Sequence, residues 1–476
     1  MEVSEDFGNP DVLVLAEDHI VLKLETALPP DSTLPEGFAL GDVDGLLLVA
    51  NKQSLVSASR SALLRGASVS KALFCGCVSF DSCDLFASAA SELLRDAQEV
   101  HIVHNRNTVY KLIRMFPNAK VIALLHDISR HYVEFDEPRR DPSAPLVEGS
   151  QLRQLVATWG DQRTECPSIS RATTLALIRS CPNVSRIDSR WVVSSFTEPP
   201  SFFTSTDRRK AKNFTHINLL DRDLALATGL GLSAVAADVA VAAKTFPSAE
   251  KLEVCLGSQQ ALDKISAFRN LRSLAVAFVP AFMSRDTSTH LGRLLAKLPD
   301  LEELEIEHCG GIRLLEISRL CSHLRVLKLA NCFGSLSDVP VDADAFADLE
   351  CLDLDMQILI PVFASLLGAI KNKLRSLHFH DQELCSAFLH YCVQNSRRLA
   401  FPSLQRLTLG TKESLSALRL QPQDLQTAVN ALPSLRHVKT DSFDLRLFFE
   451  NCRALRGRVS LSWTGCVYCA VHKPAY

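Results

Sequence analysis

One pattern occurs twice in the stretch 301–332, LEELEIEHCGGIRLLEISRLCSHLRVLKLANC. The two copies are offset by 23 residues at each of four positions, which are Leu301 and Leu324, Leu304 and Leu327, Ile306 and Leu329, and Cys309 and Cys332. A fixed period of roughly twenty to fifty residues is typical of a solenoid, in which each unit buries its apolar side chains against its neighbours. This period constrains the fold more strongly than any single residue does.

The apolar and cysteine positions of this stretch resemble the cysteine-containing leucine-rich repeat, L-x-x-L-x-L-x-x-C-x-x-I, which is followed by a helix that ends in C-x-x-L. Ile312 closes the first half of the motif, and Cys321 to Leu324 supply the junction. Repeats of this kind are best known from F-box/leucine-rich-repeat proteins. The resemblance implies an α/β leucine-rich-repeat solenoid (a horseshoe), with a parallel sheet on the concave side and helices on the convex side.

The same period extends over the second half of the chain. The first apolar positions of successive units are separated by 22, 30, 23, 25, 25, 30 and 31 residues, and they are Ala249, Leu271, Leu301, Leu324, Leu349, Leu374, Leu404 and Leu435. Each interval has room for a strand, a turn and one helix. Apolar side chains recur at helical spacing in 289–298 and 425–432, and over a shorter run in 317–321.

Similar strand cores begin near residue 97, so we predict a solenoid over 97–460 and a C-terminal cap over 461–476. The additional cores are Val100–His104, Ala119–Leu125, Leu152–Thr158, Val184–Arg190 and a last strand within Leu455–Ser462. A proline stands directly before several cores, as in Phe116-Pro117-Asn118, where it ends the preceding helix and favours extended backbone.

Residues 1–96 are expected to be an irregular N-terminal segment or degenerate repeats. The predicted strands there are Val12–Leu15, Gly45–Val49 and Ala72–Phe80, and the predicted helices are Lys52–Leu64 and Ser82–Leu94. An F-box opens with L-P-x-E before three helices. Only the fragment Leu34-Pro35-Glu36 matches, and the strand-like stretch 38–49 follows it, so no F-box is recognisable.

Two polar segments, 135–145 and 191–212, interrupt the repeats and are expected to be loops. The second contains the basic run RRKAK at 208–212, for which we favour a solvated loop over a nuclear import signal. The apolar stretch 224–243 has the length of a membrane span, but it is rich in alanine and contains Asp238. We predict a buried helix there, with Ser233 as a candidate N-cap.

Composition narrows the class of protein. A net charge of −3 gives no overall attraction to nucleic acid or to a membrane surface. The acidic start MEVSED does not resemble a secretory signal. The 15 cysteines lie mostly at repeat positions and not at the spacings of a disulfide framework, which suits core residues of an intracellular protein. We expect a cytoplasmic location, with the nucleus as the alternative.

The candidate binding residues come from the alternation of side chains along each strand. The consensus leucines point inward, so the residues between them line the concave sheet. The candidate protein-binding residues are Glu303, Glu305, Glu307, Lys328, Asp353, Asp355, His378, His380 and Arg406. The carboxylates on this face suit a basic segment of a protein partner. The alternative is that these charges only keep an exposed sheet soluble.

The metal and enzyme patterns are weak. His378 and His380 share a strand face but supply only two of the three or four ligands that a metal needs. Cys466, Cys469 and His472 form C-x-x-C-x-x-H and with Cys452 could supply four zinc ligands, but a single C-x-x-C lacks the second half-site of a strong zinc motif, so we favour cysteines of a capping segment. The sequence has no nucleotide-binding, G-x-S-x-G or H-E-x-x-H motif. We therefore expect no catalysis, no metal and no cofactor.

These patterns predict a non-catalytic scaffold that binds a protein partner on its concave face. The alternative, which rests on the resemblance alone, is the substrate-recognition subunit of a cullin-type ubiquitin ligase that binds the ligase adaptor. The missing F-box argues against that alternative, because the F-box is the segment that docks the adaptor.

Overall fold

A computed structural model of the chain describes two compact units, which divide between Ile217 and Asn218. The described residues are 11–15, 19–24, 46–50, 69–74, 94–103, 109–125, 150–158, 169, 171–189, 191–197, 209–219, 236–279, 285–335, 339–396, 400–410, 418, 420–440, 442–452 and 459–462.

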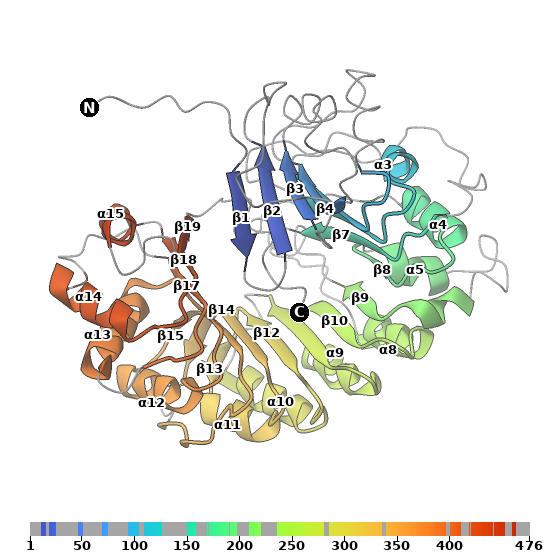
Figure 1. Ribbon diagram of the computed structural model, residues 1–476. Coiled ribbons are helices and arrows are strands. Elements are labelled where there is room, and N and C mark those ends of the chain that lie inside the picture. Colours follow the sequence, from blue (N-terminus) through green and yellow to red (C-terminus); the bar gives the residue numbers. More distant parts are fainter. Residues whose placement is uncertain are drawn as a thin grey trace, which may run out of the picture. The chain divides into compact units, whose positions relative to one another are not determined.

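The first unit is built on an eight-stranded sheet whose strands follow one another in chain order (Figure 1). These strands are β1 (Asp11–Leu15), β2 (His19–Leu24), β3 (Leu46–Ala50), β4 (Val69–Phe74), β5 (Glu99–Val103), β6 (Val121–Leu125), β7 (Gln154–Thr158) and β8 (Arg186–Ile187). All neighbours are parallel except β1 and β2. Its described helices are α3 (Val109–Met115), α4 (Arg171–Ser180), α5 (Trp191–Thr197) and the short 3-10 helix η4 (Lys210–Asn213).

Most of the strands predicted for this unit are confirmed. The expected strands at 12–15 and 45–49 are β1 and β3, and each early strand core contains a strand. Strand β2 was not predicted, and β4 begins at Val69, three residues before the expected start. The predicted helix at 52–64 and the loop at 135–145 lie outside the described residues, as does the predicted helix at 82–94 except for Leu94, which lies in a turn.

The segment 191–212 is not simply a loop, because it contains α5 and η4. Val192 and Val193 are buried, and the ring of Phe196 packs edge-on against Phe214 with centroids 5.6 Å apart. These apolar contacts stabilise a helix that the charged run at 207–212 obscured in the sequence.

The second unit contains an eleven-stranded sheet, in which β13 pairs with β14 beside the main order. Its strands are β9 (His216–Leu219), β10 (Lys251–Leu256), β11 (Ser273–Phe278), β12 (Glu303–Glu307), β13 (Gly310–Ile312), β14 (Val326–Gly334), β15 (Cys351–Gln357), β16 (Ser376–Phe379), β17 (Arg406–Leu409), β18 (His437–Thr440) and β19 (Ser460–Ser462). The division between the two units falls within β9.

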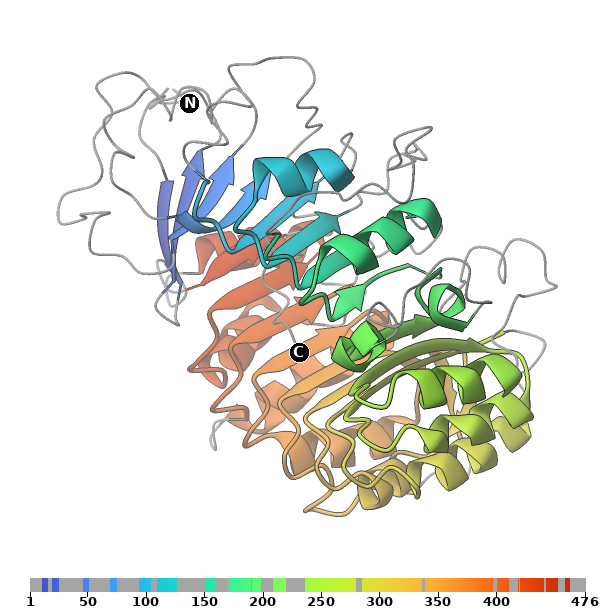
Figure 2. The same cartoon turned by 90° about the vertical axis from the view of Figure 1, so that its right-hand side faces the viewer.

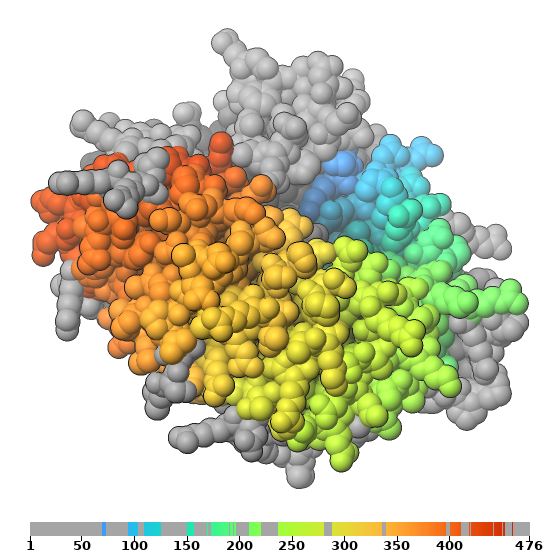
Figure 3. Space-filling view, turned by 90° about the horizontal axis from the view of Figure 1, so that it is seen from below, coloured from blue at the N-terminus to red at the C-terminus, as the bar shows by residue number. Residues whose placement is uncertain are grey.

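Helices separate most of these strands along the chain and cover one face of the sheet (Figures 1 and 2). They are α8 (Ala236–Thr245), α9 (Gln259–Lys264), α10 (Arg285–Leu295), α11 (Leu314–Leu320), α12 (Ile360–Ile370), α13 (Gln382–Gln394), α14 (Pro422–Asn430) and α15 (Phe443–Asn451), with the 3-10 turn η5 (Ile265–Ala267) after α9. The expected helices at 289–298, 317–321 and 425–432 correspond to α10, α11 and α14. Seen from below, this unit presents a continuous surface coloured from green to red (Figure 3).

The repeat positions predicted from the sequence set the register of this sheet. From β10 to β18 (leaving out β13) every strand begins two residues after a predicted repeat start. The second residues of these strands pair across the sheet in one row, and each is at most 1% exposed: Leu252, Leu274, Leu304, Leu327, Leu352, Leu377, Leu407 and Val438. The solenoid repeat is thereby confirmed at the level of single residues.

Aromatic and cysteine side chains fill the space between the sheet and the helices. The rings of Phe363, Phe379, Phe388 and Phe401 pack in series, edge-on or tilted, with centroids 5.3 to 5.4 Å apart. All nine cysteines in the described part of the chain are buried and free. Burial raises the pKa of Cys309, and likewise of Cys332, to about 12, so both thiols stay protonated and act as core residues, as predicted.

The apolar stretch 224–243 is described from residue 236 onward, where α8 begins. Val239 and Ala242 of α8 are fully buried, whereas Val241 is 42% exposed, so the predicted helix is present but is buried on one side only. The candidate N-cap Ser233 lies outside the described residues. Across the part of the chain that the structure describes, no helix is long and apolar enough to cross a membrane.

Candidate interaction face

The face of the second sheet that lies opposite helices α8–α15 is called the inner face below. It carries the side chains that alternate with the buried aliphatic row. Two rows of paired residues cross it from β10 to β18. The first row consists of the first residue of each strand: Lys251, Ser273, Glu303, Val326, Cys351, Ser376, Arg406 and His437. The second row consists of the third residue of each strand: Glu253, Ala275, Glu305, Lys328, Asp353, His378, Thr408 and Lys439.

Glu303 is held in place by residues on two preceding strands. Ser273 Oγ donates a hydrogen bond of 2.6 Å to Glu303 Oε2, and Lys251 Nζ lies 3.5 Å from the same oxygen. The carboxylate side chain remains 22% exposed. Its negative charge is thus fixed on the inner face but still reaches solvent.

Lys328 lies between two carboxylates of the neighbouring strands. Its Nζ is 3.8 Å from Glu305 Oε2, and Asp353 is its register partner on β15. Burial acts to lower the pKa of Lys328, but the negative charges of Glu305 and Asp353 raise it above its ordinary value. The lysine is therefore charged and links β12, β14 and β15 electrostatically.

Asp353 also contacts His380, the residue that directly follows β16. His380 Nε2 lies 2.9 Å from Asp353 Oδ1. Burial acts to raise the pKa of Asp353, yet the hydrogen bond with His380 and the charges of His378, His380 and Lys328 hold this pKa well below its ordinary value. The carboxylate is consequently ionised across the physiological range.

One predicted binding residue, Glu307, is more deeply buried than the other carboxylates of the inner face. Glu307 is only 4% exposed, and its Oε1 lies 3.4 Å from His308 Nε2. Asp355 is half-buried at the end of the same face. The exposed acidic surface therefore depends on Glu303, Glu305 and Asp353 more than on Glu307.

His378 occupies the junction between β16 and β17. Its Nε2 lies 2.8 Å from Ser376 Oγ, and its Nδ1 lies 2.7 Å from Thr408 Oγ1. A Ser–His pair of this kind suggests a nucleophile, but Ser376 is only 2% exposed, and a hydroxyl rather than a carboxylate orients the ring. The contacts therefore fix the imidazole between two strands and give no catalytic arrangement.

Arg406 lies two strands from Asp353, beside residues that the sequence analysis did not single out as a site. Its register partner on β18 is His437, and Lys439 occupies the next inner-face position. Burial and then the charges of Arg406 and Lys439 lower the pKa of His437 to about 4. The repeat spacing gave a signal for this group, because it places all three residues between buried core positions.

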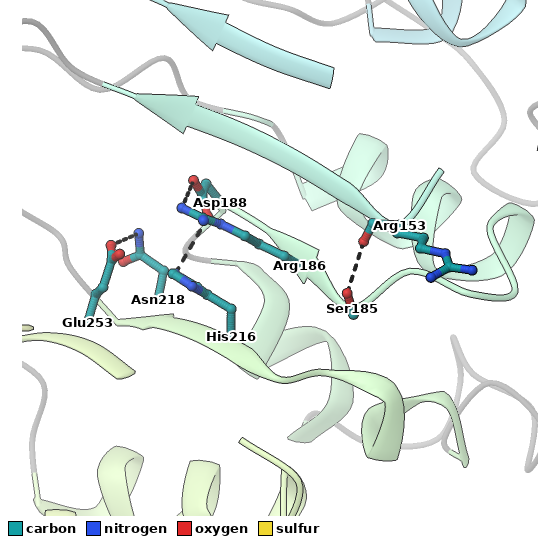
Figure 4. Close-up of polar contacts among 7 residues, drawn as sticks. All are labelled: Arg153, Ser185, Arg186, Asp188, His216, Asn218 and Glu253. Atoms are coloured by element: carbon teal, nitrogen blue, oxygen red, sulfur yellow. Dashed lines mark hydrogen bonds and ion pairs between the residues drawn. The ribbon is translucent and has the colours of Figure 1, made fainter. Parts of the chain in front are cut away.

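The first unit carries a separate polar cluster after β8 (Figure 4). Arg186 makes a bidentate contact with Asp188, with Nε–Oδ1 and Nη2–Oδ2 distances of 2.8 Å. His216 Nε2 lies 3.8 Å from Asp188 Oδ1. In the second unit, Asn218 Nδ2 donates a hydrogen bond of 3.2 Å to Glu253 Oε2. The repeat spacing places Glu253 on the inner face, but it gives no signal for the contact of Glu253 with Asn218 or for the pairing of Arg186 with Asp188.

The candidate metal ligands receive no support from the geometry. His378 and His380 are bound to different partners, as described above. Cys466, Cys469 and His472 lie outside the described residues. Among the residues that are described, no group of three or more His, Cys, Asp or Glu side chains is arranged to hold a metal ion.

Repeats of 22 to 31 residues, parallel strands and one buried aliphatic row decide the fold of the second unit. It is a leucine-rich-repeat solenoid. No family model matches the sequence, and a search of curated proteins finds no match.

Solved structures of low similarity include leucine-rich-repeat proteins. One from Leptospira interrogans is 13% identical, with 84% of this chain and 91% of that chain covered and a TM-score of 0.29. An internalin from Listeria monocytogenes is 12% identical, with 78% and 81% covered and a TM-score of 0.30. A Bacteroides fragilis protein is 12% identical, with 44% and 69% covered and a TM-score of 0.27.

Proposed function

We propose that the chain is a non-catalytic scaffold whose inner face binds a basic segment of a protein partner. The acidic charge of β10–β15 supports this proposal most directly. The inner-face positions of these strands carry six carboxylates (Glu253, Glu303, Glu305, Glu307, Asp353 and Asp355) and two lysines (Lys251 and Lys328). Opposite charge on a partner steers its approach and sets its register.

The size of the face favours a protein over a small molecule. Seven strand spacings of about 4.8 Å separate β10 from β18, so the face extends over about 35 Å. Small ligands bind in concave pockets that enclose most of their surface. A broad row of charged side chains instead matches an extended polypeptide or the surface of a folded domain.

The carboxylates are already positioned before a partner arrives. Ser273 and Lys251 hold Glu303, and Lys328 lies beside both Glu305 and Asp353. Fixed side chains lose little conformational entropy on binding, which favours affinity. The same lysines also reduce repulsion between the carboxylates.

Charge reversal at Glu303→Lys and Glu305→Lys tests the proposal. Captured partners are cross-linked to the full chain, and the cross-linked peptides are mapped by mass spectrometry. We expect basic peptides attached to β10–β15, and at least a tenfold loss of capture by the double variant. Asp263→Lys, an exposed change on α9, is the matched control and should bind normally. Equal capture by all three proteins would contradict the proposal.

The same capture experiment addresses the ligase alternative. Recovery of a cullin and its adaptor would support a substrate receptor, and their absence would exclude that role under the conditions used. The buried free thiols suit a reducing compartment, so we propose that the protein is located in the cytoplasm or the nucleus. Extracts of these compartments are therefore the source of partners for the capture experiment.

A further inference from the structure

Large apolar side chains are exposed next to β14 and β15. In the described part of the chain seven large apolar side chains are at least 42% exposed, and four of them fall within 333–360. These four are called the apolar edge below: Phe333 (45%), Val339 (51%), Leu359 (43%) and Ile360 (47%). Single exposed apolar residues are ordinary, whereas several close together mark a surface that binds another molecule.

Backbone contacts bring Phe333 close to Leu359. Phe333 on β14 pairs in register with Gln357 on β15. A Cβ added to Gly334, the next residue, would lie 3.7 Å from the Cα of Ile358, which directly precedes Leu359. The two apolar residues therefore lie on adjacent segments at the same end of the two strands.

Val339 and Ile360 are linked through helix α12. Ile360 is the first residue of that helix. The backbone N–H of Val341 donates a hydrogen bond of 3.0 Å to Ser365 Oγ, in the second turn of α12, and this bond holds the segment that contains Val339 against the helix. The apolar edge is therefore one region of the surface.

Leu359 is also the N-cap of α12, and its side chain accepts no hydrogen bond from the helix. Three other helices of this unit have Ser258, Asp381 and Ser442 at the N-cap, and each of these side chains accepts a hydrogen bond from the helix backbone. Serine and aspartate are strongly preferred at an N-cap, and leucine is strongly disfavoured. Stability of the fold therefore does not explain an exposed leucine at this position, but contact with another molecule does.

The apolar edge lies in an acidic part of the chain. Residues 329–370 contain seven carboxylates and no lysine, arginine or histidine. Asp342 and Asp344 are exposed directly after the segment that contains Val339, and Asp353 and Asp355 lie on the inner face of β15. Negative charge therefore borders the exposed apolar side chains.

This charge distinguishes three kinds of molecule that could cover the apolar edge. A second copy of the chain would bring the same carboxylates, which repel one another. The cytoplasmic surface of a membrane is negative as well. A protein segment that carries both apolar and basic side chains matches the apolar surface and its charge.

The apolar edge continues the inner face at the end of β15. Gln357, the register partner of Phe333, follows Asp355 by two residues, or about 7 Å of strand. Leu359 follows Gln357 by two further residues. An extended peptide, at about 3.3 Å per residue, covers these distances with two to four residues.

We propose that the apolar edge binds a leucine, isoleucine, methionine or phenylalanine of the protein partner, two to four residues from a lysine or arginine that contacts Asp353 or Asp355. This inference rests on the proposed function, because the same basic segment contacts the inner face. It makes the partner segment amphipathic. Burial of the apolar side chain supplies affinity, and the carboxylates set the orientation of the segment.

A degenerate peptide pool with two fixed lysines, two residues apart, tests this inference on the full-length protein. A matched pool carries glutamate at both fixed positions. We expect at least tenfold more retention of the lysine pool. Its retained peptides should be at least fivefold enriched in leucine, isoleucine, methionine or phenylalanine two to four residues from a lysine.

Leu359→Ser separates binding from folding. Serine is a better N-cap than leucine, so the midpoint of thermal unfolding should be equal or higher, while the apolar enrichment should fall at least threefold. Phe333→Thr keeps a residue suited to a strand and should reduce the enrichment in the same way. Leu447→Ser, at a similarly exposed leucine on α15, is the matched control and should leave the enrichment unchanged. Unchanged enrichment in the folded Leu359 and Phe333 variants would overturn the inference.

This inference and the proposed function fail in different ways. Retention of the lysine pool without apolar enrichment would overturn the inference and leave the proposed function intact. Equal retention of the lysine and glutamate pools would overturn both. The Glu303→Lys and Glu305→Lys double variant should lose the lysine pool as a whole, whereas Leu359→Ser should lose only the apolar preference.

Two measurements without peptide test the other molecules that could cover the apolar edge. Sedimentation of the protein alone should show a monomer, and vesicles that contain phosphatidylserine should not bind it. A dimer that Leu359→Ser dissociates would assign the apolar edge to a second copy of the chain. Vesicle binding that Leu359→Ser abolishes would assign it to a membrane. Either result would overturn the inference.

Discussion

His308 and Asn331 occupy equivalent positions of adjacent repeats, and both have left-handed backbone, with φ of 57° and 50°. The two strands are joined here as well, because the backbone N–H of His308 donates a hydrogen bond of 3.0 Å to the carbonyl of Ala330. Each residue directly precedes a buried cysteine, Cys309 or Cys332. The left-handed residue changes the direction of the chain directly after β12 and at a register shift within β14, so that these thiols enter the core.

This conformation predicts opposite effects for two substitutions at the exposed Asn331. A residue with a Cβ pays about 1 kcal/mol or more in the left-handed region, which asparagine tolerates better than alanine and which costs glycine nothing. Asn331→Ala should lower the free energy of unfolding by about 1 kcal/mol, and Asn331→Gly should leave it equal or slightly higher. Urea unfolding measures both, and equal destabilisation by the two would contradict the role of the turn.

Gly410 gives a second prediction, because the backbone of β16 lies against it. A Cβ at this position would lie 2.8 Å from the carbonyl oxygen of Phe379 and 3.1 Å from the Cα of His380. The N–H of Gly410 also donates a hydrogen bond of 2.7 Å to that carbonyl, so the strands cannot separate without losing it. We expect Gly410→Ala to destabilise the protein by about 1 to 3 kcal/mol.

Gly310→Ala is the matched control for Gly410→Ala. A Cβ at Gly310 would meet no atom within 4 Å. The control should change the unfolding free energy by less than about 0.5 kcal/mol. Similar losses for the two variants, measured by urea unfolding, would show that backbone crowding is not the cause.

The repeat spacing was sufficient to predict the strands and inner-face positions of the second unit. The buried residues Leu304 and Leu327 pair directly, as their offset requires. The residues that follow them, Glu305 and Lys328, also pair and lie on the inner face. The period determines which face a residue lies on, because a shift of one residue would turn every side chain over. It therefore predicted the location of the candidate face.

Other features depend on contacts that a single period does not encode. Glu307 has the same strand parity as Glu305, yet its burial depends on the turn at His308 that follows it. Strand β2 pairs antiparallel with β1 and breaks the repeat rule, so the spacing gave no reason to expect it. The contact between His380 and Asp353 joins residues that are 27 positions apart in the sequence, and the repeat spacing does not predict it.

The ionised Asp353 predicts how stability changes in acid. Its pKa in the folded protein lies below its ordinary value of 3.8, so the unfolded chain takes up the proton first as the pH falls. The stabilisation is therefore complete above about pH 5, begins to fall as the pH passes the ordinary value, and is fully lost only below the pKa of the folded protein. Asp353→Asn should lower the unfolding free energy by about 1 kcal/mol at pH 7, and the difference from the natural protein should shrink below pH 4.

Asp348→Asn separates this effect from that of an exposed ion pair. Asp348 Oδ1 lies 2.6 Å from Lys373 Nζ, but both side chains are about half exposed, at 45% and 59%. Exposed pairs are screened by salt and contribute little. We expect the Asp348 variant to be close to the natural protein at 0.5 M NaCl, while the Asp353 variant keeps most of its loss. Equal salt sensitivity would contradict the distinction.

Lys210 provides a prediction for the first unit. Its Nζ donates hydrogen bonds to two carbonyl oxygens in the last turn of α4, of 2.9 Å to Ile178 and 2.8 Å to Arg179. These carbonyls lie at the negative end of the helix dipole, where a bound ammonium is favourable. The basic run at 208–212 is therefore not only a solvated loop, because one of its lysines joins η4 to α4.

Lys210→Met should lower the unfolding free energy of the first unit by about 1 to 2 kcal/mol, since methionine keeps the aliphatic length but donates no hydrogen bond. Lys212→Met is the matched control, because Lys212 lies in the same 3-10 turn and is exposed. Hydrogen exchange of the α4 amides gives a local measure. Faster exchange in the Lys210 variant but not in the Lys212 variant is expected, and equal rates in both would refute the helix-capping role of Lys210.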